Sequence, residues 1–142
     1  MAQLVEVTAI TMNTQPVDNL TLLITPFRVR NYQASGGSDT YIQYQAVDQH
    51  RIMDLTVDEA PGDLDADMAD YTSRMITLAV ETENDVPVGA DRAIKTDDIV
   101  WCQEYQYDSA KSIVRIFNNE SPMAMDLLVT HTLAEILVLA ND

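Results

Sequence analysis

Three alternating aspartates form the segment that most resembles a site for chemistry. Asp63-Leu64-Asp65-Ala66-Asp67 places carboxylates at the first, third and fifth positions, as at the start of an EF-hand calcium loop. That loop also needs glycine at its sixth position and a bidentate glutamate at its twelfth. Here those positions hold Met68 and Arg74. We interpret the aspartates as an acidic helix start that faces water, and we expect the protein to fold without calcium.

The histidines and the cysteine do not form a recognisable catalytic or metal-binding set. His50 and His131 are the only histidines, and Cys102 is the only cysteine. A structural zinc site needs four ligands of this kind, and a nucleophilic thiol needs a nearby cation or histidine to lower its pKa. Nearby Asp98 and Glu104 would raise that pKa instead. We therefore predict no catalytic residue, no cofactor and no metal, and interpret Cys102 as a small packing residue.

Aromatic residues at alternate positions give the best candidate for a protein contact. Trp101, Tyr105 and Tyr107 are expected to project from one face of a strand at residues 99–107. Partly polar aromatic faces are enriched at protein interfaces, but the same residue types also pack in cores. The sequence leaves both interpretations open, and we take these three residues as a candidate partner-contact face.

The charge balance restricts the kinds of partner. The chain has 142 residues with 23 acidic and 8 basic side chains, which gives a formal net charge of −15. Binding to phosphate backbones or to anionic membrane surfaces needs clustered lysine and arginine, so we expect neither nucleic acid nor membrane as a direct partner. No apolar run approaches the roughly 20 residues of a membrane-spanning helix, and no signal-peptide pattern stands at the N-terminus. Other protein subunits are the expected partners.

The elements that would position these residues are mostly strands. Alternating and β-branched segments predict strands at residues 4–10, 20–29, 40–45, 51–57, 75–80, 99–107, 112–117 and 123–129. Polar turns are expected at residues 13–19, 108–111 and 118–122, an acidic loop at 81–91, and a tight hairpin turn around Gly36-Gly37. One helix is expected to begin near Pro61. A second is expected at residues 132–139, where Thr132-x-x-Glu135 forms a capping box.

Landmarks in the two halves of the chain predict an internal repeat. Met53-Asp54-Leu55-x-Val57 in the first half is matched by Met125-Asp126-Leu127-x-Val129 in the second. Pro16-Val17 is likewise matched by Pro87-Val88, and Tyr32-Gln33 by Tyr105-Gln106, in the same order and at offsets close to half the chain. We predict an α+β, predominantly β fold of two tandem β-rich units, residues 1–71 and 72–142, each ending in a short helix. The two units can also pack as one compact pseudo-twofold domain.

The ends of the two predicted units resemble small structural and accessory proteins of tailed bacteriophages. The resemblance lies in the opening Leu4-Val5-Glu6-Val7-Thr8-Ala9-Ile10 and in the close at residues 125–137, where a strand leads into Glu135-Ile136-Leu137. The helix near Pro61 departs from this pattern. The resemblance implies a virus-encoded accessory or structural protein that has no catalytic residues.

Two functions from different classes follow. The first is a non-enzymatic viral structural protein, such as a capsid decoration, minor capsid or connector component, made in the host cytoplasm and assembled into the virion with its own copies or with capsid proteins. The alternative is an acidic regulatory or inhibitory binding protein that mimics nucleic acid. A mimic needs a continuous stripe of carboxylates, whereas the acidic residues cluster at residues 58–70 and 81–98. This patchy distribution favours the structural protein.

Overall fold

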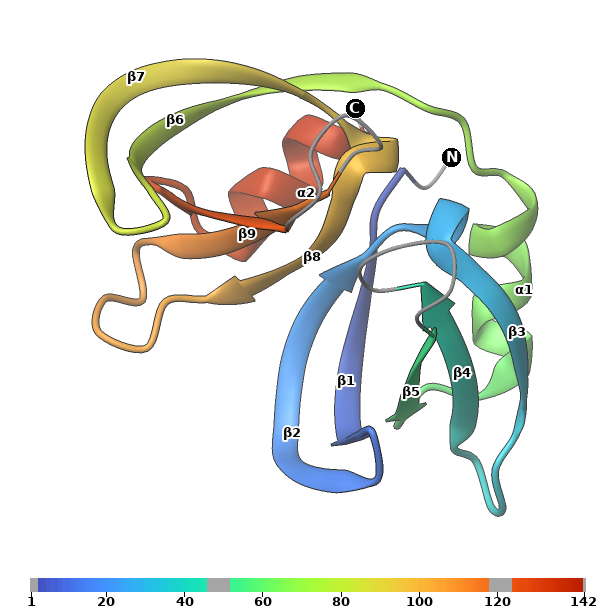
Figure 1. Ribbon diagram of the computed structural model, residues 1–142. Helices are drawn as coiled ribbons and strands as arrows, with labels where there is room; N and C mark the ends of the chain where they lie inside the picture. The colour runs from blue at the N-terminus through green and yellow to red at the C-terminus, as the bar shows by residue number, and fades with distance from the viewer. Residues whose placement is uncertain (1–2, 46–51, 118–123, 142) are drawn as a thin grey trace.

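The computed structural model describes residues 3–45, 52–117 and 124–141, and it is predominantly β (Figure 1). The described residues form one ten-stranded sheet, two α-helices and two 3-10 turns. In chain order these are β1 (Val5–Met12), β2 (Gln15–Ile24), η1 (Pro26–Arg28), β3 (Val29–Ala34), β4 (Thr40–Gln45), β5 (Ile52–Val57), α1 (Pro61–Ala69), β6 (Met75–Glu83), β7 (Val86–Lys95), η2 (Thr96–Asp98), β8 (Ile99–Glu104), β9 (Ser112–Ile116), β10 (Met125–Val129) and α2 (Leu133–Asn141). The predicted α+β, mostly β class is confirmed.

The sheet is antiparallel throughout, in the order β3-β4-β5-β1-β2-β8-β9-β10-β6-β7. The five strands of the first half are therefore followed by the five strands of the second. A short ladder between β2 and β8 joins the halves, with Leu22 opposite Gln103, Leu23 opposite Cys102 and Ile24 opposite Trp101. We call this ladder the junction. It leaves β3 and β7 at the two ends of the strand order (Figure 1).

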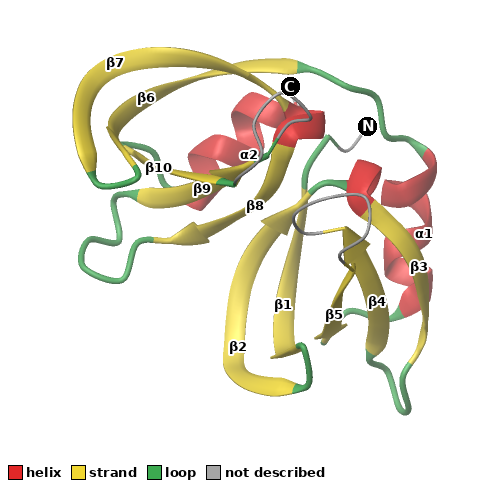
Figure 2. Ribbon diagram, in the orientation of Figure 1, coloured by secondary structure: helices red, strands yellow, loops and turns green. Residues whose placement is uncertain are grey.

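Two hydrophobic cores lie on opposite faces of this sheet. Successive side chains of a strand point to opposite faces, so Leu22 and Ile24 enter one core while Leu23 enters the other. The first core also contains Leu64 of α1, and the second contains Ile136 of α2. The two helices consequently cover opposite faces of one continuous sheet, one in each half of the chain (Figure 2).

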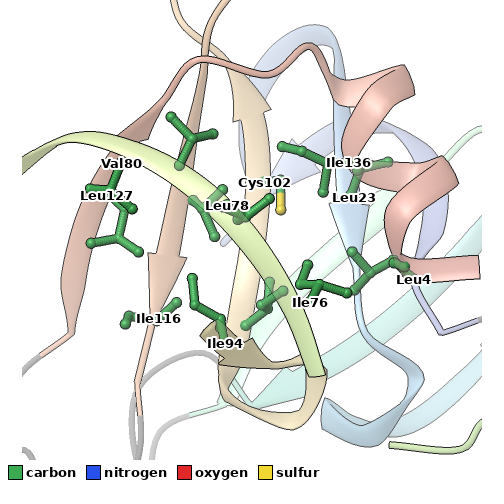
Figure 3. Close-up of a cluster of buried hydrophobic side chains, with 14 residues drawn as sticks. Leu4, Leu23, Ile76, Leu78, Val80, Ile94, Cys102, Ile116, Leu127 and Ile136 are labelled. Carbon is green, nitrogen blue, oxygen red and sulfur yellow. The ribbon is translucent and has the colours of Figure 1, made fainter. Parts of the chain in front are cut away.

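The two cores share residues across the junction. Leu4 and Leu23 of the first half are buried in the second core, beside Ile136 (Figure 3). In the other direction, Val100 is buried in the first core and Trp101 packs against it. Burying large apolar side chains of this kind contributes roughly 1.5–3 kcal/mol each. Each half is therefore stabilised by side chains that the other half supplies.

Local turn and cap chemistry agrees with the sequence in two places. The predicted hairpin turn joins β3 to β4, and Gly36 and Gly37 both have positive φ, which glycine adopts without steric cost. The predicted capping box is also confirmed. The Thr132 N–H donates to Glu135 Oε1 at 3.2 Å, and the Glu135 N–H donates to Thr132 Oγ1 at 3.1 Å.

Several predicted boundaries are wrong. The acidic segment 81–91 is not a loop, because β6 continues to Glu83 and β7 begins at Val86 after a two-residue turn. Most side chains of β7 are exposed, so its sequence lacks the alternating apolar pattern of a strand and resembles that of a loop. The predicted turn at 13–19 is likewise mostly strand, since β2 begins at Gln15. The predicted strand at 20–29 ends at Ile24, because Pro26 starts the 3-10 turn η1. The predicted turn at 118–122 lies outside the described residues.

The two ends of the described chain are tied together by one side chain. Asn141, the last residue of α2, accepts hydrogen bonds from the backbone N–H groups of Gln3 (2.7 Å) and Leu4 (3.1 Å), and it donates to the Leu4 carbonyl (3.2 Å). These bonds fix the segment that leads into β1 against α2. They also explain why Leu4 reaches the second core.

Candidate functional site

Trp101 lies at the junction and is half-buried. It stands on β8 opposite Ile24 of β2, and its ring packs against the first core. On the other side, the guanidinium of Arg115 lies 4.7 Å from the centre of the ring, in a cation–π arrangement. Arg115 is held there by Asp126, whose carboxylate accepts hydrogen bonds from Arg115 Nε at 2.7 Å and from Arg115 Nη2 at 3.0 Å. Trp101 is therefore largely committed to contacts within the chain.

Tyr105 and Tyr107 lie beyond the end of β8, in the connection to β9. Because β8 ends at Glu104, the two tyrosines do not continue the strand face that carries Trp101. Their rings pack edge to face, with centroids 5.4 Å apart, and Tyr107 is 77% exposed. Tyr105 lines a polar hollow of about 260 Å³ together with Asn84, Asp85 and Asp126. The three residues of the candidate contact face are thus divided between the junction and this exposed turn.

This division predicts different effects of substitution. Trp101→Glu should lower the free energy of unfolding by about 2 kcal/mol, because it places a charge against the first core and removes the ring over which Arg115 lies. Tyr107→Glu should change it by less than about 0.5 kcal/mol, as is usual at exposed positions. Urea denaturation of both variants measures the difference. Equal effects would contradict the placement of Trp101.

Beside the junction lies a buried arginine that the sequence pattern did not single out. Arg28, the last residue of η1, is only 5% exposed. Its guanidinium donates to three backbone carbonyls: Ile99 (3.1 Å), Phe117 (2.7 Å) and Gln45 (3.3 Å). Burial lowers the pKa of Arg28, and the nearby Tyr44 and Asp98 oppose that shift. An arginine inside the apolar segment 20–29 is the signal that could have identified it.

A buried tyrosine completes the polar contacts of the junction. Tyr44 on β4 is fully buried in the first core, and its hydroxyl donates to the Val100 carbonyl at 2.5 Å. The same oxygen accepts the Thr25 N–H at 3.0 Å. Arg28 and Tyr44 of the first half together satisfy the carbonyls of Ile99 and Val100, at the start of β8. We call these two side chains the junction clamp.

The aspartates that resemble a calcium loop lie on a helix. Residues 63–67 fall within α1, so the carboxylates of Asp63, Asp65 and Asp67 spread around a helix and do not line the inside of a loop. Asp65 also accepts a hydrogen bond from the Tyr32 hydroxyl at 2.6 Å. This geometry agrees with the interpretation as an acidic, largely solvent-facing helix.

Cys102 and His131 occupy structural positions. Cys102 is fully buried in the second core, and burial raises the pKa of its thiol far above the usual range, which disfavours the nucleophilic thiolate. The Nε2 atom of His131 accepts the Ala79 N–H at 3.0 Å, just before α2. His50 lies outside the described residues. Within the described part of the chain, histidine, cysteine and acidic side chains form no group of three that could hold a metal ion.

The outer face of α2 is apolar and exposed. Val138 is 56% and Leu139 is 39% exposed, and with Ala134 and His131 they border a shallow hollow of about 420 Å³. The exposed side chains of α1 include Asp63 and Asp65 instead. The two helices therefore present very different surfaces to solvent.

Comparison with protein-family models, curated proteins and solved structures finds no match for this chain. Its class is accordingly defined by the fold itself, an antiparallel ten-stranded sheet with one helix on each face. Among the residues that the structure describes, no helix combines the length and the apolar character that crossing a membrane would require.

Proposed function

We propose that the chain consists of two copies of one unit, residues 1–71 and 72–142. Both halves run strand, strand, 3-10 turn, three strands, helix, and both contribute their strands to the sheet in the same relative order. The registers agree as well. β4 and β5 pair from Thr40–Val57 to Tyr44–Met53, and β9 and β10 pair from Ser112–Val129 to Ile116–Met125, so all four positions keep the offset that relates Met53 to Met125.

Repeated hydrogen bonds support the same proposal. Asn13 and Asp54 exchange two bonds, in which the Asn13 N–H donates to the Asp54 carbonyl and the Asp54 N–H donates to Asn13 Oδ1. Asn84 and Asp126 make the same two bonds in the second half. Because such bonds depend on side-chain type as well as on backbone position, they are stronger support than strand order alone.

A further pair of contacts follows the same offset although the residue types differ. The Thr40 hydroxyl donates to the Glu59 carbonyl at 2.6 Å, and the Ser112 hydroxyl donates to the His131 carbonyl at 2.7 Å. The Glu59 carboxylate accepts the Thr8 N–H, as the His131 imidazole accepts the Ala79 N–H. The position held by Glu59 in one half and His131 in the other therefore requires a hydrogen-bond acceptor, which both side chains supply.

One sequence landmark does not belong to this set. Tyr32 lies within β3 and pairs with Ile42, whereas Tyr105 follows the end of β8. The residue of the second half that stands in the position of Tyr32 is Cys102, which pairs with Val114. The match of Tyr32-Gln33 with Tyr105-Gln106 is thus not a structural correspondence.

We infer that the protein is a non-enzymatic structural protein that acts by assembly with other subunits. The observation that carries this proposal is the junction, where two β-rich halves join edge to edge into one sheet and still leave an edge strand at each end. Exposed edge strands offer backbone donors and acceptors to further subunits. The partners are then copies of this chain or other proteins of the same assembly.

Placement in a virion rests on the phage-like ends of the units. In that setting the chain is a capsid decoration, minor capsid or connector component, made in the host cytoplasm. The test is quantitative mass spectrometry of purified virions with isotope-labelled peptides of this chain. A fixed copy number per particle is expected. A chain that is abundant in infected cells but absent from particles would overturn the virion proposal and favour the acidic regulatory binder.

A further inference from the structure

We propose that β7 of one copy pairs with β3 of a second copy, in the register that joins β2 to β8 within the chain. This inference rests on the proposed function, and it names the partner, the surface and the register of the contact. In the proposed repeat, β7 is the counterpart of β2 and β3 is the counterpart of β8. The two ends of the sheet therefore have the same backbone layout as the two strands of the junction.

The residues of β7 that would pair are found by comparing the β1–β2 hairpin with the β6–β7 hairpin. Val7 pairs with Leu22 in β1–β2, and its counterpart Leu78 pairs with Arg92 in β6–β7. Continuing along the strands, the junction residues Leu22, Leu23 and Ile24 correspond to Arg92, Ala93 and Ile94.

The residues of β3 that would pair are found from the bulges at the start of β3 and of β8. The register shifts between Val29 and Asn31 in one strand and between Ile99 and Trp101 in the other. After the shift, Asn31, Tyr32 and Gln33 correspond to Trp101, Cys102 and Gln103. The contact between copies therefore places Arg92 opposite Gln33, Ala93 opposite Tyr32, and Ile94 opposite Asn31.

The part of β7 that would pair is free of features that block pairing. Proline and positive φ protect edge strands, and β7 has both at Pro87 and Gly89. β2 has the same features at Pro16 and Asp18, yet its last residues form the junction. In both strands the proline and the positive-φ residue come before the three pairing residues, which are 22–24 in β2 and 92–94 in β7. Ala93 is also exposed, so no other part of the described chain covers it.

The contact extends the sheet from copy to copy. Within one chain β3 and β7 are the terminal strands of the order and are not paired with each other, so each leaves an edge that a second copy can pair with. The contact is heterologous, because two different surfaces meet. Each added copy leaves one β3 edge and one β7 edge free until a ring closes. The products are closed rings or open filaments.

The contact between copies is weaker than the internal junction, because the junction clamp is not repeated. Asp98 ends η2 where Arg28 ends η1, and Ile116 stands where Tyr44 stands. The apolar pair Leu23–Cys102 is replaced by Ala93–Tyr32. We therefore expect association that is reversible and depends on concentration.

The register is tested by cysteine cross-linking of the full chain under mild oxidation with oxidised glutathione. Directly opposed residues of antiparallel strands have Cα separations within the range that a disulfide spans. The double variant Ala93→Cys/Tyr32→Cys is expected to give a ladder of covalent oligomers on a non-reducing gel. Each single variant should stop at dimer or below. As a geometric control, Leu23→Cys should form an intramolecular disulfide with native Cys102, which it faces in the junction.

Sedimentation velocity provides a second test without cross-links. Wild-type protein should show average masses that rise with concentration above the 15.9 kDa monomer. Ala93→Asp should weaken the apparent association at least about tenfold. Val88→Asp, on the same strand but outside the pairing segment, should leave it unchanged.

The results separate the failure of this contact from the failure of the proposed function. A wild type that stays monomeric, or a double-cysteine variant that gives no species beyond dimer, would overturn the contact. If such a protein still has a fixed copy number in virions, the structural function stands and only this surface is wrong. If Ala93→Cys alone gave covalent dimers in the same yield as the double variant, the β7 strands of two copies would be pairing with each other. That result would also overturn the register.

Discussion

Replacing Arg28 with methionine is expected to lower the free energy of unfolding by about 3 kcal/mol. The substitution retains most of the aliphatic volume but removes the donors to the carbonyls of Ile99, Gln45 and Phe117. A buried acceptor without a partner costs about 1–3 kcal/mol. Relief of the desolvation of the charged guanidinium offsets part of this loss, which keeps the estimate well below the sum of three such costs.

Arg30→Met is the matched control for this variant. Arg30 is exposed on β3, close to Arg28 in the sequence, so its loss should change stability by less than about 0.5 kcal/mol. Arg28→Lys should fall between the two, because one ammonium group keeps the charge but cannot reach three separated carbonyls. Urea unfolding curves followed by circular dichroism measure all three. An Arg28→Met protein as stable as the Arg30→Met control would show that the clamp does not stabilise the junction.

Local patterns predicted the β3–β4 hairpin and the helix starts because the signals for these features are also local. The positive φ of Gly36 and Gly37 and the capping box at Thr132 depend on a few neighbouring residues, and both were found where expected. β7 was missed for the converse reason. Among the described strands it pairs with β6 alone, and it is exposed on most of its length, so its backbone is held by a partner strand and not by burial of its own side chains.

The candidate site could be predicted only in part, because its essential contacts are distant in the sequence. Arg28 donates to carbonyls 71 and 89 residues away, and Tyr44 donates to one 56 residues away. No spacing rule connects such residues. The predicted alternation of Trp101 with Tyr105 and Tyr107 assumed a strand to residue 107, whereas β8 ends at Glu104. The acidic composition likewise gave the sign of the surface without showing that Asp63 and Asp67 lie on α1 while the outer face of α2 is apolar.

In the proposed repeat, the distribution of polar contacts explains how one unit can serve two kinds of interface. Within the chain, the clamp and the apolar pair Leu23–Cys102 make the junction a permanent part of the core. At the free ends, the counterpart positions hold Ala93 and Tyr32, which are compatible with solvent when no partner is present. The same backbone register therefore supports a fixed contact inside the chain and, in our proposal, a reversible one between chains.

Replacing Tyr44 with phenylalanine is expected to lower the free energy of unfolding by about 2–3 kcal/mol at neutral pH. Phenylalanine fills the same space in the first core, but the Val100 carbonyl and the Thr25 N–H each lose a partner in a buried site. The same variant should also change how stability depends on alkaline pH. Burial raises the pKa of Tyr44 far above its ordinary value near 10, so the folded state keeps a proton that the unfolded state releases.

This difference gives the pH dependence its sign. The stabilising contribution of the neutral hydroxyl is fully present below about pH 10, the pKa of an unfolded tyrosine, and it is lost as the pH rises above that value. Wild-type stability should fall there more steeply than that of Tyr44→Phe, by about 1.4 kcal/mol per pH unit. Tyr107→Phe, at an exposed position, is the control for removal of one hydroxyl. Urea denaturation between pH 8 and about pH 11 measures the slopes, and parallel slopes for wild type and Tyr44→Phe would contradict a buried, neutral Tyr44 at the junction.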